Sequence, residues 1–211
     1  DRVIGKTEGQ LIVVACPGSG KTTTLLRRID HMVHDRGIEP EHILMITFTS
    51  AAAKEMRTRY ERDYEKNGVT FCTIHSLCMA ILRKFKSLNN ESILVDASDF
   101  FYEKLRYNNI INDKTDFIKT LMTDISVVKN NFLDYREYLP KCSNDKVLFR
   151  ELYEGYETYK EELGLIDFDD MLTEAYEEMM NNPFCLEWLQ KKYRYIQVDK
   201  YQDTNYLQRD I

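Results

Sequence analysis

The chain has 211 residues, of which 43% are hydrophobic and 30% charged, and its formal net charge is −6. This length corresponds to one or two domains with a sizeable core. No apolar stretch approaches the ~20 residues of a membrane-spanning helix, and the five cysteines form no CxxC pair, so composition excludes a membrane-embedded protein, disfavours a disulfide framework and favours a cytoplasmic setting.

The first predicted element is a strand over residues 11–15, an apolar run near the N-terminus. The loop that follows contains Gly18 and Gly20, which permit turns that direct successive backbone N–H groups inward. Apolar residues at helical spacing then predict a helix that begins near Lys21 and ends near Gly37. A helix that begins there directs the positive end of its dipole at the loop, which favours bound anions.

This strand, loop and helix match the P-loop pattern. The pattern predicts that the Lys21 ammonium contacts the β and γ phosphates of ATP and that the Thr22 hydroxyl binds Mg²⁺. Ala15 stands where the pattern has its first glycine, at the end of the strand, where alanine is acceptable. A chance glycine turn between a strand and a helix is the alternative. The residues predicted to bind the nucleotide are Pro17, Gly18, Ser19, Gly20, Lys21, Thr22 and Thr23.

Alternating strands and helices continue to about residue 86. Strands are predicted at 43–48 and 69–72, and helices from Ser50 and over 75–85. This alternation predicts an α/β fold, in which a parallel sheet carries helices on both faces.

The pattern changes between residues 87 and 163, where helical signals rich in Tyr, Asn, Asp and Lys predominate. Helices are predicted around 117–128 and 148–163. Their aromatic residues recur at helical spacing, which favours a role in a core over a surface on which bases stack. A helix from about Asp169 and a strand over 195–198 then return to the alternation of helices and strands that is predicted before residue 86.

A second motif lies at the end of the chain. Residues 195–203 read YIQVDKYQD, a strand that ends at Asp199 and supplies the carboxylate that a Mg-nucleotide site needs. Because Lys21 and Asp199 must then meet at one phosphate, we expect residues 1–86 and 164–211 to form one ATP-binding domain. Residues 87–163 are expected to form an inserted helical subdomain.

Five segments occur in an order that resembles a known family. They are ACPGSGKT (15–22), ITFTSAAAKEM (46–56), TIHSLC (73–78), DFDDML (167–172) and VDKYQDTN (198–205). Their order resembles the first motor lobe, with its inserted helical domain, of UvrD/Rep-type superfamily 1 DNA helicases. The resemblance covers nearly the whole chain and implies a RecA-like ATP-binding domain.

The resemblance also implies a DNA-binding surface. The segment around Phe48 and Thr49 would contact single-stranded DNA, and stacking on an aromatic ring suits a protein that must bind any sequence. Thr73, His75 and Ser76 would contact the DNA backbone from the loop that opens a helix. The net charge of −6 is unusual for a nucleic-acid-binding protein, although a groove can be locally positive on an acidic molecule.

Other interpretations of these segments remain open. Phe48 can simply end a buried strand, with Ser50 as the cap of the next helix, and His75 alone would more often be structural. The spacing of Cys72, His75 and Cys78 permits a metal site, but no second pair of ligands accompanies it. The aspartates at 167, 169 and 170 are expected to cap a helix rather than to bind metal or transfer protons.

The final motif departs from the family. Where the resemblance implies an Asp-Glu pair, this chain has Asp199 followed by Lys200. An ammonium group has three donors and no acceptor, so it cannot act as the base that the glutamate provides. We therefore expect Mg-ATP to bind but to be hydrolysed poorly. Catalytic roles are implied for Lys21, Asp199 and Gln202, with Lys200 at the position of the catalytic glutamate.

These observations predict the N-terminal ATP-binding fragment of an ATP-dependent 3′–5′ DNA helicase, a single-stranded DNA translocase of the repair or recombination type. The chain starts at Asp1 and stops at Ile211 just after the second motif, so a piece of a longer protein is expected. The expected partners are single-stranded DNA or a duplex/single-strand junction and a second motor lobe of the same full-length chain. The alternatives are a nonhydrolysing ATP- and DNA-binding module and a P-loop small-molecule kinase.

Overall fold

The computed structural model describes residues 2–16, 18–64, 66, 68–108, 111–143 and 145–211. They form two units, Asp1–Leu77 with Asn182–Thr204 (unit 1) and Cys78–Asn181 with Asn205–Ile211 (unit 2). The domain boundaries proposed from the sequence, at 86/87 and 163/164, differ from these units. Helix α8 (Phe168–Asn181) packs on α6 (Lys114–Asn130), α10 (Tyr206–Asp210) packs on α8, and the chain from Cys78 onward also belongs to unit 2.

Unit 1 contains a three-stranded parallel sheet of order β2-β1-β3, with β1 at Ile43–Thr47, β2 at Thr70–Thr73 and β3 at Tyr195–Val198. All five residues of β1 are buried, as expected for a central strand covered on both faces. The predicted α/β class and parallel sheet are therefore confirmed. Because the strands are parallel, the residues that follow each of them lie at the same edge of the sheet.

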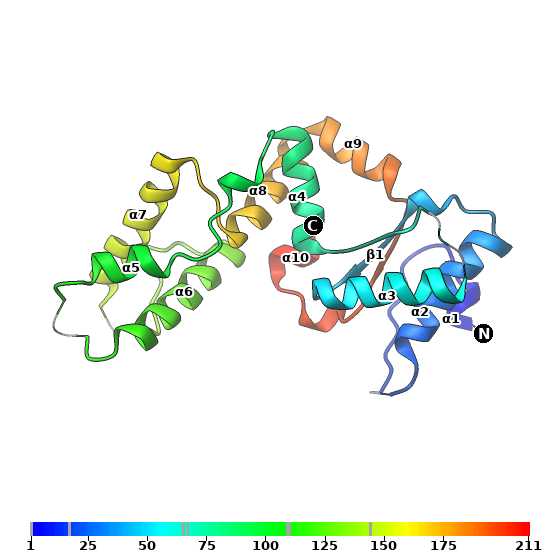
Figure 1. The fold of residues 1–211 in the computed structure, drawn as a ribbon, viewed down its shortest axis with the longest axis horizontal. Coiled ribbons are helices and arrows are strands. Elements are labelled where there is room, and N and C mark those ends of the chain that lie inside the picture. The colour runs from blue at the N-terminus through cyan, green and yellow to red at the C-terminus, as the bar shows by residue number, and fades with distance from the viewer. Residues whose placement is uncertain (1, 17, 65, 67, 109–110, 144) are drawn as a thin grey trace. The chain divides into compact units, whose positions relative to one another are not determined.

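The helices of unit 1 are α1 (Arg2–Gly5), α2 (Lys21–Asp30), α3 (Ser50–Asp63), α9 (Pro183–Lys192) and the first turn of α4 (Ile74–Phe85). Short helical turns occur at His31–Asp35, Pro40–His42 and Tyr201–Asp203. Helices α2 and α3 share one core with the sheet (Figure 1). That core contains Leu26, Ile29, Met32, Ile43, Met45, Met56, Tyr60, Val69 and Phe71.

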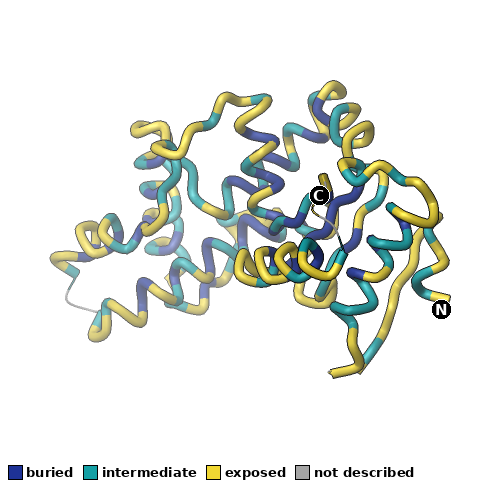
Figure 2. The backbone as a smooth tube through the Cα atoms, turned by 45° about the vertical axis from the view of Figure 1, so that its right-hand side comes forward, coloured by how far each residue is buried: buried dark blue, intermediate teal, exposed yellow. Residues whose placement is uncertain are grey.

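The expected strand over residues 11–15 is not formed. These residues have no regular secondary structure, and Ile12 and Val14 are 82% and 94% exposed. The exposed stretch ahead of α2 is visible in Figure 2. The prediction was wrong here because an apolar run becomes a strand only when another strand completes its hydrogen-bond ladder, and none does so among the described residues.

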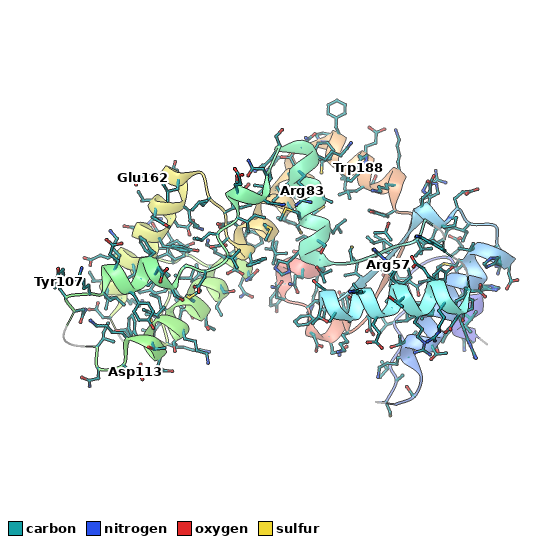
Figure 3. The ribbon with its side chains drawn as sticks, in the orientation of Figure 1. Arg57, Arg83, Tyr107, Asp113, Glu162 and Trp188 are labelled. Atoms are coloured by element: carbon teal, nitrogen blue, oxygen red, sulfur yellow. The ribbon has the colours of Figure 1, made fainter. Side chains whose placement is uncertain are left out.

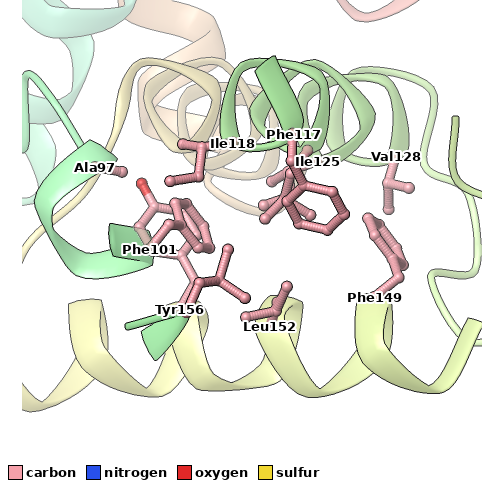
Figure 4. Packing of buried hydrophobic residues seen from close by; sticks show 11 residues of the cluster. Ala97, Phe101, Phe117, Ile118, Ile125, Val128, Phe149, Leu152 and Tyr156 are labelled. Carbon is pink, nitrogen blue, oxygen red and sulfur yellow. The ribbon is translucent and has the colours of Figure 1, made fainter. Parts of the chain in front are cut away.

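Unit 2 is helical, with α5 (Ser98–Lys104), α6 (Lys114–Asn130), α7 (Lys146–Leu163), α8, α10 and most of α4, and a short turn at Asn90–Ser92. Figure 4 shows the apolar residues of α6 facing those of α7. The aromatic residues of this region pack on one another, for example Phe101 on Tyr156 with ring centroids 5.1 Å apart. Their expected role in a core is confirmed. The buried members of this core are Ala97, Phe101, Leu105, Phe117, Ile118, Leu121, Ile125, Val128, Phe149, Leu152 and Tyr156.

Candidate nucleotide and DNA site

The predicted phosphate-binding loop turns at its two glycines and leads into a helix, although the strand expected ahead of it is not formed. Gly18 and Gly20 have φ angles of 76° and 80°, in the left-handed region that favours glycine. Helix α2 begins at Lys21, and no side chain caps it at Gly20. The N–H groups of its first turn have no acceptor within the helix, so they suit an anion. Pro17 lies outside the described residues.

The Lys21 ammonium group lies over the loop. Its Nζ donates to the carbonyl oxygens of Ala15 at 3.0 Å and Cys16 at 3.1 Å. The Ser19 N–H also donates to the Cys16 carbonyl, at 3.2 Å, which closes the turn. The positive charge of Lys21 is thus held against the backbone of the loop.

Asp199 directly follows β3 at the carboxyl edge of the sheet. Its backbone N–H donates to the Ile46 carbonyl at 2.9 Å, so the ladder with β1 continues up to this residue. The side chains of Asp199 and Thr22 are oxygen donors of the kind that Mg²⁺ prefers. That they share one ion stays a prediction.

Lys200 follows Asp199 with a φ of 58°, a left-handed conformation that is uncommon for a residue with a side chain. It is exposed, and a short turn at Tyr201–Asp203, which contains Gln202, follows it. The chain therefore turns sharply where the resemblance implies a catalytic glutamate, and places an ammonium-bearing side chain there.

Phe48 and Thr49 have different environments. Phe48 lies just beyond β1 and is 56% exposed, so it does not end a buried strand. The Thr49 side chain accepts a hydrogen bond from the Ala52 N–H at 3.2 Å and so caps α3. The helix predicted from Ser50 is confirmed, whereas the alternative in which Ser50 is the cap is wrong, because Ser50 is already the first residue of the helix.

The segment from Thr73 to Ser76 opens α4. Thr73 is buried, and its hydroxyl accepts from the Ser76 N–H at 3.1 Å and lies 2.9 Å from the Ser76 hydroxyl. Thr73 is thus a helix cap, whereas Ser76 is exposed and His75 half-buried. A contact between these residues and DNA stays a prediction.

Cys72, His75 and Cys78 do not form a metal site. Within the described ranges, no three His, Cys, Asp or Glu residues are grouped so that they could hold a metal ion. Burial raises the pKa of the half-buried Cys72 thiol to about 11, so this side chain is protonated at neutral pH.

The aspartates of the DFDDML segment are structural, as expected, and their role extends beyond capping. The Asp167 carboxylate accepts from the Asp170 N–H at 2.8 Å and caps α8. Asp167 also accepts from the ammonium groups of Lys129 and Lys160, each at 3.0 Å, and Asp169 accepts from Ser126 at 2.9 Å. The two lysines could not be found from the sequence, because they lie on α6 and α7.

Arg59 is a further residue that motif analysis missed. Its guanidinium group on α3 donates to the Thr23 hydroxyl on α2 at 2.7 Å. Arg57 on the same helix, labelled in Figure 3, donates to the Phe71 carbonyl of β2 at 2.8 Å. These contacts attach α3 to both α2 and the sheet.

Comparisons with known proteins identify the family of the chain and its relatives. The sequence profile of the UvrD/REP helicase N-terminal domain matches residues 1–211. A putative ATP-dependent DNA helicase, YjcD of Bacillus subtilis, is 34% identical over 219 residues, which covers 100% of this chain and 29% of that protein. The ATP-dependent DNA helicase PcrA of Staphylococcus epidermidis is 34% identical over 209 residues, which covers 94% of this chain and 28% of the relative.

The PcrA helicase of Leuconostoc citreum is 33% identical over 214 residues, 97% of this chain and 29% of that protein. The chain thus spans less than a third of the length of the curated relatives it matches. In the described part of the chain, no helix has the length and apolar character needed to cross a membrane. On the match over its whole length, the chain belongs to the UvrD/REP helicase N-terminal domain family.

Proposed function

We propose that this chain is the ATP-binding first motor lobe of an ATP-dependent, 3′–5′ DNA helicase of the repair or recombination type. It binds Mg-ATP, contributes to binding of single-stranded DNA or a duplex/single-strand junction, and works with a second motor lobe of the same full-length protein. The observation that carries the proposal is the P-loop geometry, in which two left-handed glycines lead into a helix that begins at Lys21.

The chemistry of the site residues suits three tasks, which are phosphate binding, Mg²⁺ binding and contact with a base. The first-turn N–H groups of α2 and the Lys21 ammonium bind and orient the β and γ phosphates. Thr22 and Asp199 would hold Mg²⁺, which neutralises charge on the phosphates when it is bound. Phe48, exposed beyond β1, offers a ring on which any base can stack.

Lys200 sets a limit on hydrolysis. The residue after the Mg²⁺ carboxylate has to accept a proton from the attacking water or orient that water, and an ammonium group has no acceptor for either task. Lys200 can instead pair with the γ phosphate and hold ATP unhydrolysed. The second candidate, a nonhydrolysing ATP- and DNA-binding module, rests on this substitution.

The decisive experiment compares ATP turnover of the full-length protein carrying Lys200 with that of its Lys200→Glu variant, with and without single-stranded DNA. We expect the variant to be faster by about 100-fold or more, the usual contribution of a general base. Stimulation by single-stranded DNA of the turnover of the protein that carries Lys200 would favour the helicase over the nonhydrolysing module and over a small-molecule kinase.

Lys54→Glu is a matched control, because it makes the same charge change at an exposed position of α3. Equal turnover by the Lys200 protein and the Lys200→Glu variant would contradict the assigned role of Lys200. Equal acceleration by Lys54→Glu would show that net charge, and not position 200, determines the rate.

A further inference from the structure

Arg59 forms a polar link between the nucleotide loop and the helix that follows Phe48. Its guanidinium group donates to the Thr23 hydroxyl at 2.7 Å, in a partly buried position. Thr23 is one residue beyond Thr22 and two beyond Lys21, so the bond reaches the first turn of the phosphate-binding helix. A charged donor makes a stronger hydrogen bond than a neutral one.

Helix α3 extends from Arg59 back to the candidate DNA-binding residues Phe48 and Thr49. It runs without interruption from Ser50 to Asp63, and Thr49 caps its first turn next to the exposed ring of Phe48. At 1.5 Å per residue, Arg59 lies roughly 13 Å along the helix from its first residue. A continuous helix of this length moves as one body, so a displacement at Arg59 also displaces the Thr49 end.

Apolar packing holds α3 and α2 in one core, through Met56 and Tyr60 on one helix and Leu26 and Ile29 on the other. This packing supports both helices whether or not a nucleotide is bound. The Arg59–Thr23 bond differs because it ends on the turn whose N–H groups and neighbouring hydroxyl would receive the phosphates and Mg²⁺. The Asp63 carboxylate lies 3.8 Å from the Arg59 Nε, but it accepts its two hydrogen bonds from Arg62, at 2.7 and 3.1 Å.

We propose that Arg59 is a positioning residue that couples occupancy of the nucleotide site to the affinity of the chain for single-stranded DNA. Binding of phosphate at the loop shifts the first turn of α2, and the bond to Thr23 transmits that shift through α3 to Phe48 and Thr49. This inference rests on the proposed function, since it needs both ligands to bind.

The test measures the dissociation constant of a fluorescent oligothymidylate for the full-length protein, with and without a nonhydrolysable ATP analogue and Mg²⁺. The quantity of interest is the ratio of the two constants. For the natural sequence we expect a ratio of at least about 5 in either direction, the lower range of allosteric coupling. Arg59→Gln and Thr23→Val should each bring the ratio to within about twofold of one.

Three further variants separate coupling from other effects. Thr23→Ser keeps the hydroxyl and should keep the ratio, whereas Lys54→Gln removes a positive charge from the same helix and should also leave it unchanged. The double variant Arg59→Gln/Thr23→Val should behave like either single variant, because both break the same bond.

A ratio preserved in Arg59→Gln, with both ligands still bound, would overturn the inference but leave the proposed function intact. A natural protein that binds neither ligand would instead overturn the proposed function. Circular dichroism and the affinity for the ATP analogue alone identify a variant that has merely misfolded. Arg59→Met, which also lacks a donor for Thr23, then replaces Arg59→Gln in the same measurement.

Discussion

At the scale of single residues, exposure separates the candidate DNA contacts. Phe48 places an aromatic ring in solvent at the carboxyl edge of the sheet. Thr73 lies at the same edge but uses its hydroxyl as a helix cap. Of these two residues, Phe48 is therefore better suited to contact a base.

We expect Phe48→Ala to weaken binding of single-stranded DNA by about 1–3 kcal/mol, the usual contribution of one stacked base. Fluorescence anisotropy with a labelled oligothymidylate measures the effect. Because stacking is insensitive to sequence, oligonucleotides of different composition should lose similar affinity. ATP binding should be unchanged, because the ring lies on the loop after β1 and not in the P-loop.

Phe184→Ala provides the comparison, since Phe184 is another exposed phenylalanine of unit 1, near the start of α9. If both variants bind DNA equally well, Phe48 does not stack on a base.

At the scale of elements, a buried ionic cluster joins three helices of unit 2. Lys129 of α6 and Lys160 of α7 have side chains only 6% and 3% exposed, and both contact Asp167 and Asp170 at the start of α8. Glu157 of α7 lies within 3.0 Å of both ammonium groups. Buried charges of this kind are tolerated only when each is paired, so the cluster requires all three helices to be in register.

Lys160→Met should lower the free energy of unfolding by about 3–5 kcal/mol at pH 7, because it leaves buried carboxylates without one of their two cations. Urea unfolding followed by circular dichroism measures the change. Lys119→Met on α6 is the control, since Lys119 is exposed, and it should change stability by less than about 0.5 kcal/mol. Equal stability of the two variants would contradict the structural role of the cluster.

The cluster also predicts how stability depends on pH. Burial by itself would raise the pKa of Asp167, but the ammonium groups of Lys129 and Lys160 outweigh burial and hold this pKa below its usual value. A lowered pKa in the folded state contributes stability above the unfolded value of ~3.9, and this contribution is lost as pH falls below it. The difference in the free energy of unfolding between the protein with Lys160 and the Lys160→Met variant should therefore become smaller in acid.

At the scale of the whole chain, the apolar segment ahead of the P-loop has exposed side chains and no partner strand among the described residues. Residues 11–14 are exposed, and no strand pairs with them in the described regions. In the described regions the outer edge of β3 also has no neighbouring strand, and the side chain of Ile196 in β3 is exposed.

In the 211-residue chain, the backbone amides of Ile12, Val13 and Val14 should exchange with deuterium at rates close to those of an unstructured peptide. Met45, on the central strand β1, should exchange more slowly by several orders of magnitude, because its ladder is complete on both sides. Mass spectrometry of peptic peptides provides both rates from one sample. Comparable protection of the two segments would show that residues 11–15 are paired in solution.

The sequence determined the features that depend on neighbouring residues. The spacing of apolar residues placed α6 and α7 correctly to within a few residues, and the loop chemistry placed the start of α2 at Lys21. The motifs and their order were also sufficient to indicate the family, since residue types at short spacings carry that chemistry. The roles of the individual site residues stay proposals.

The tertiary structure alone decided the contacts between distant segments. The bond from Arg59 to Thr23 joins residues 36 positions apart, and that from Lys129 to Asp167 joins residues 38 apart. In each pair the two residues lie on different elements, so the periodicity within one helix or strand does not relate them. The same applies to residues 11–15, whose composition favours a strand but whose ladder depends on another segment. The periodicity of apolar residues shows on which face of a helix or strand a residue lies. The packing of the elements determines which distant residue it contacts.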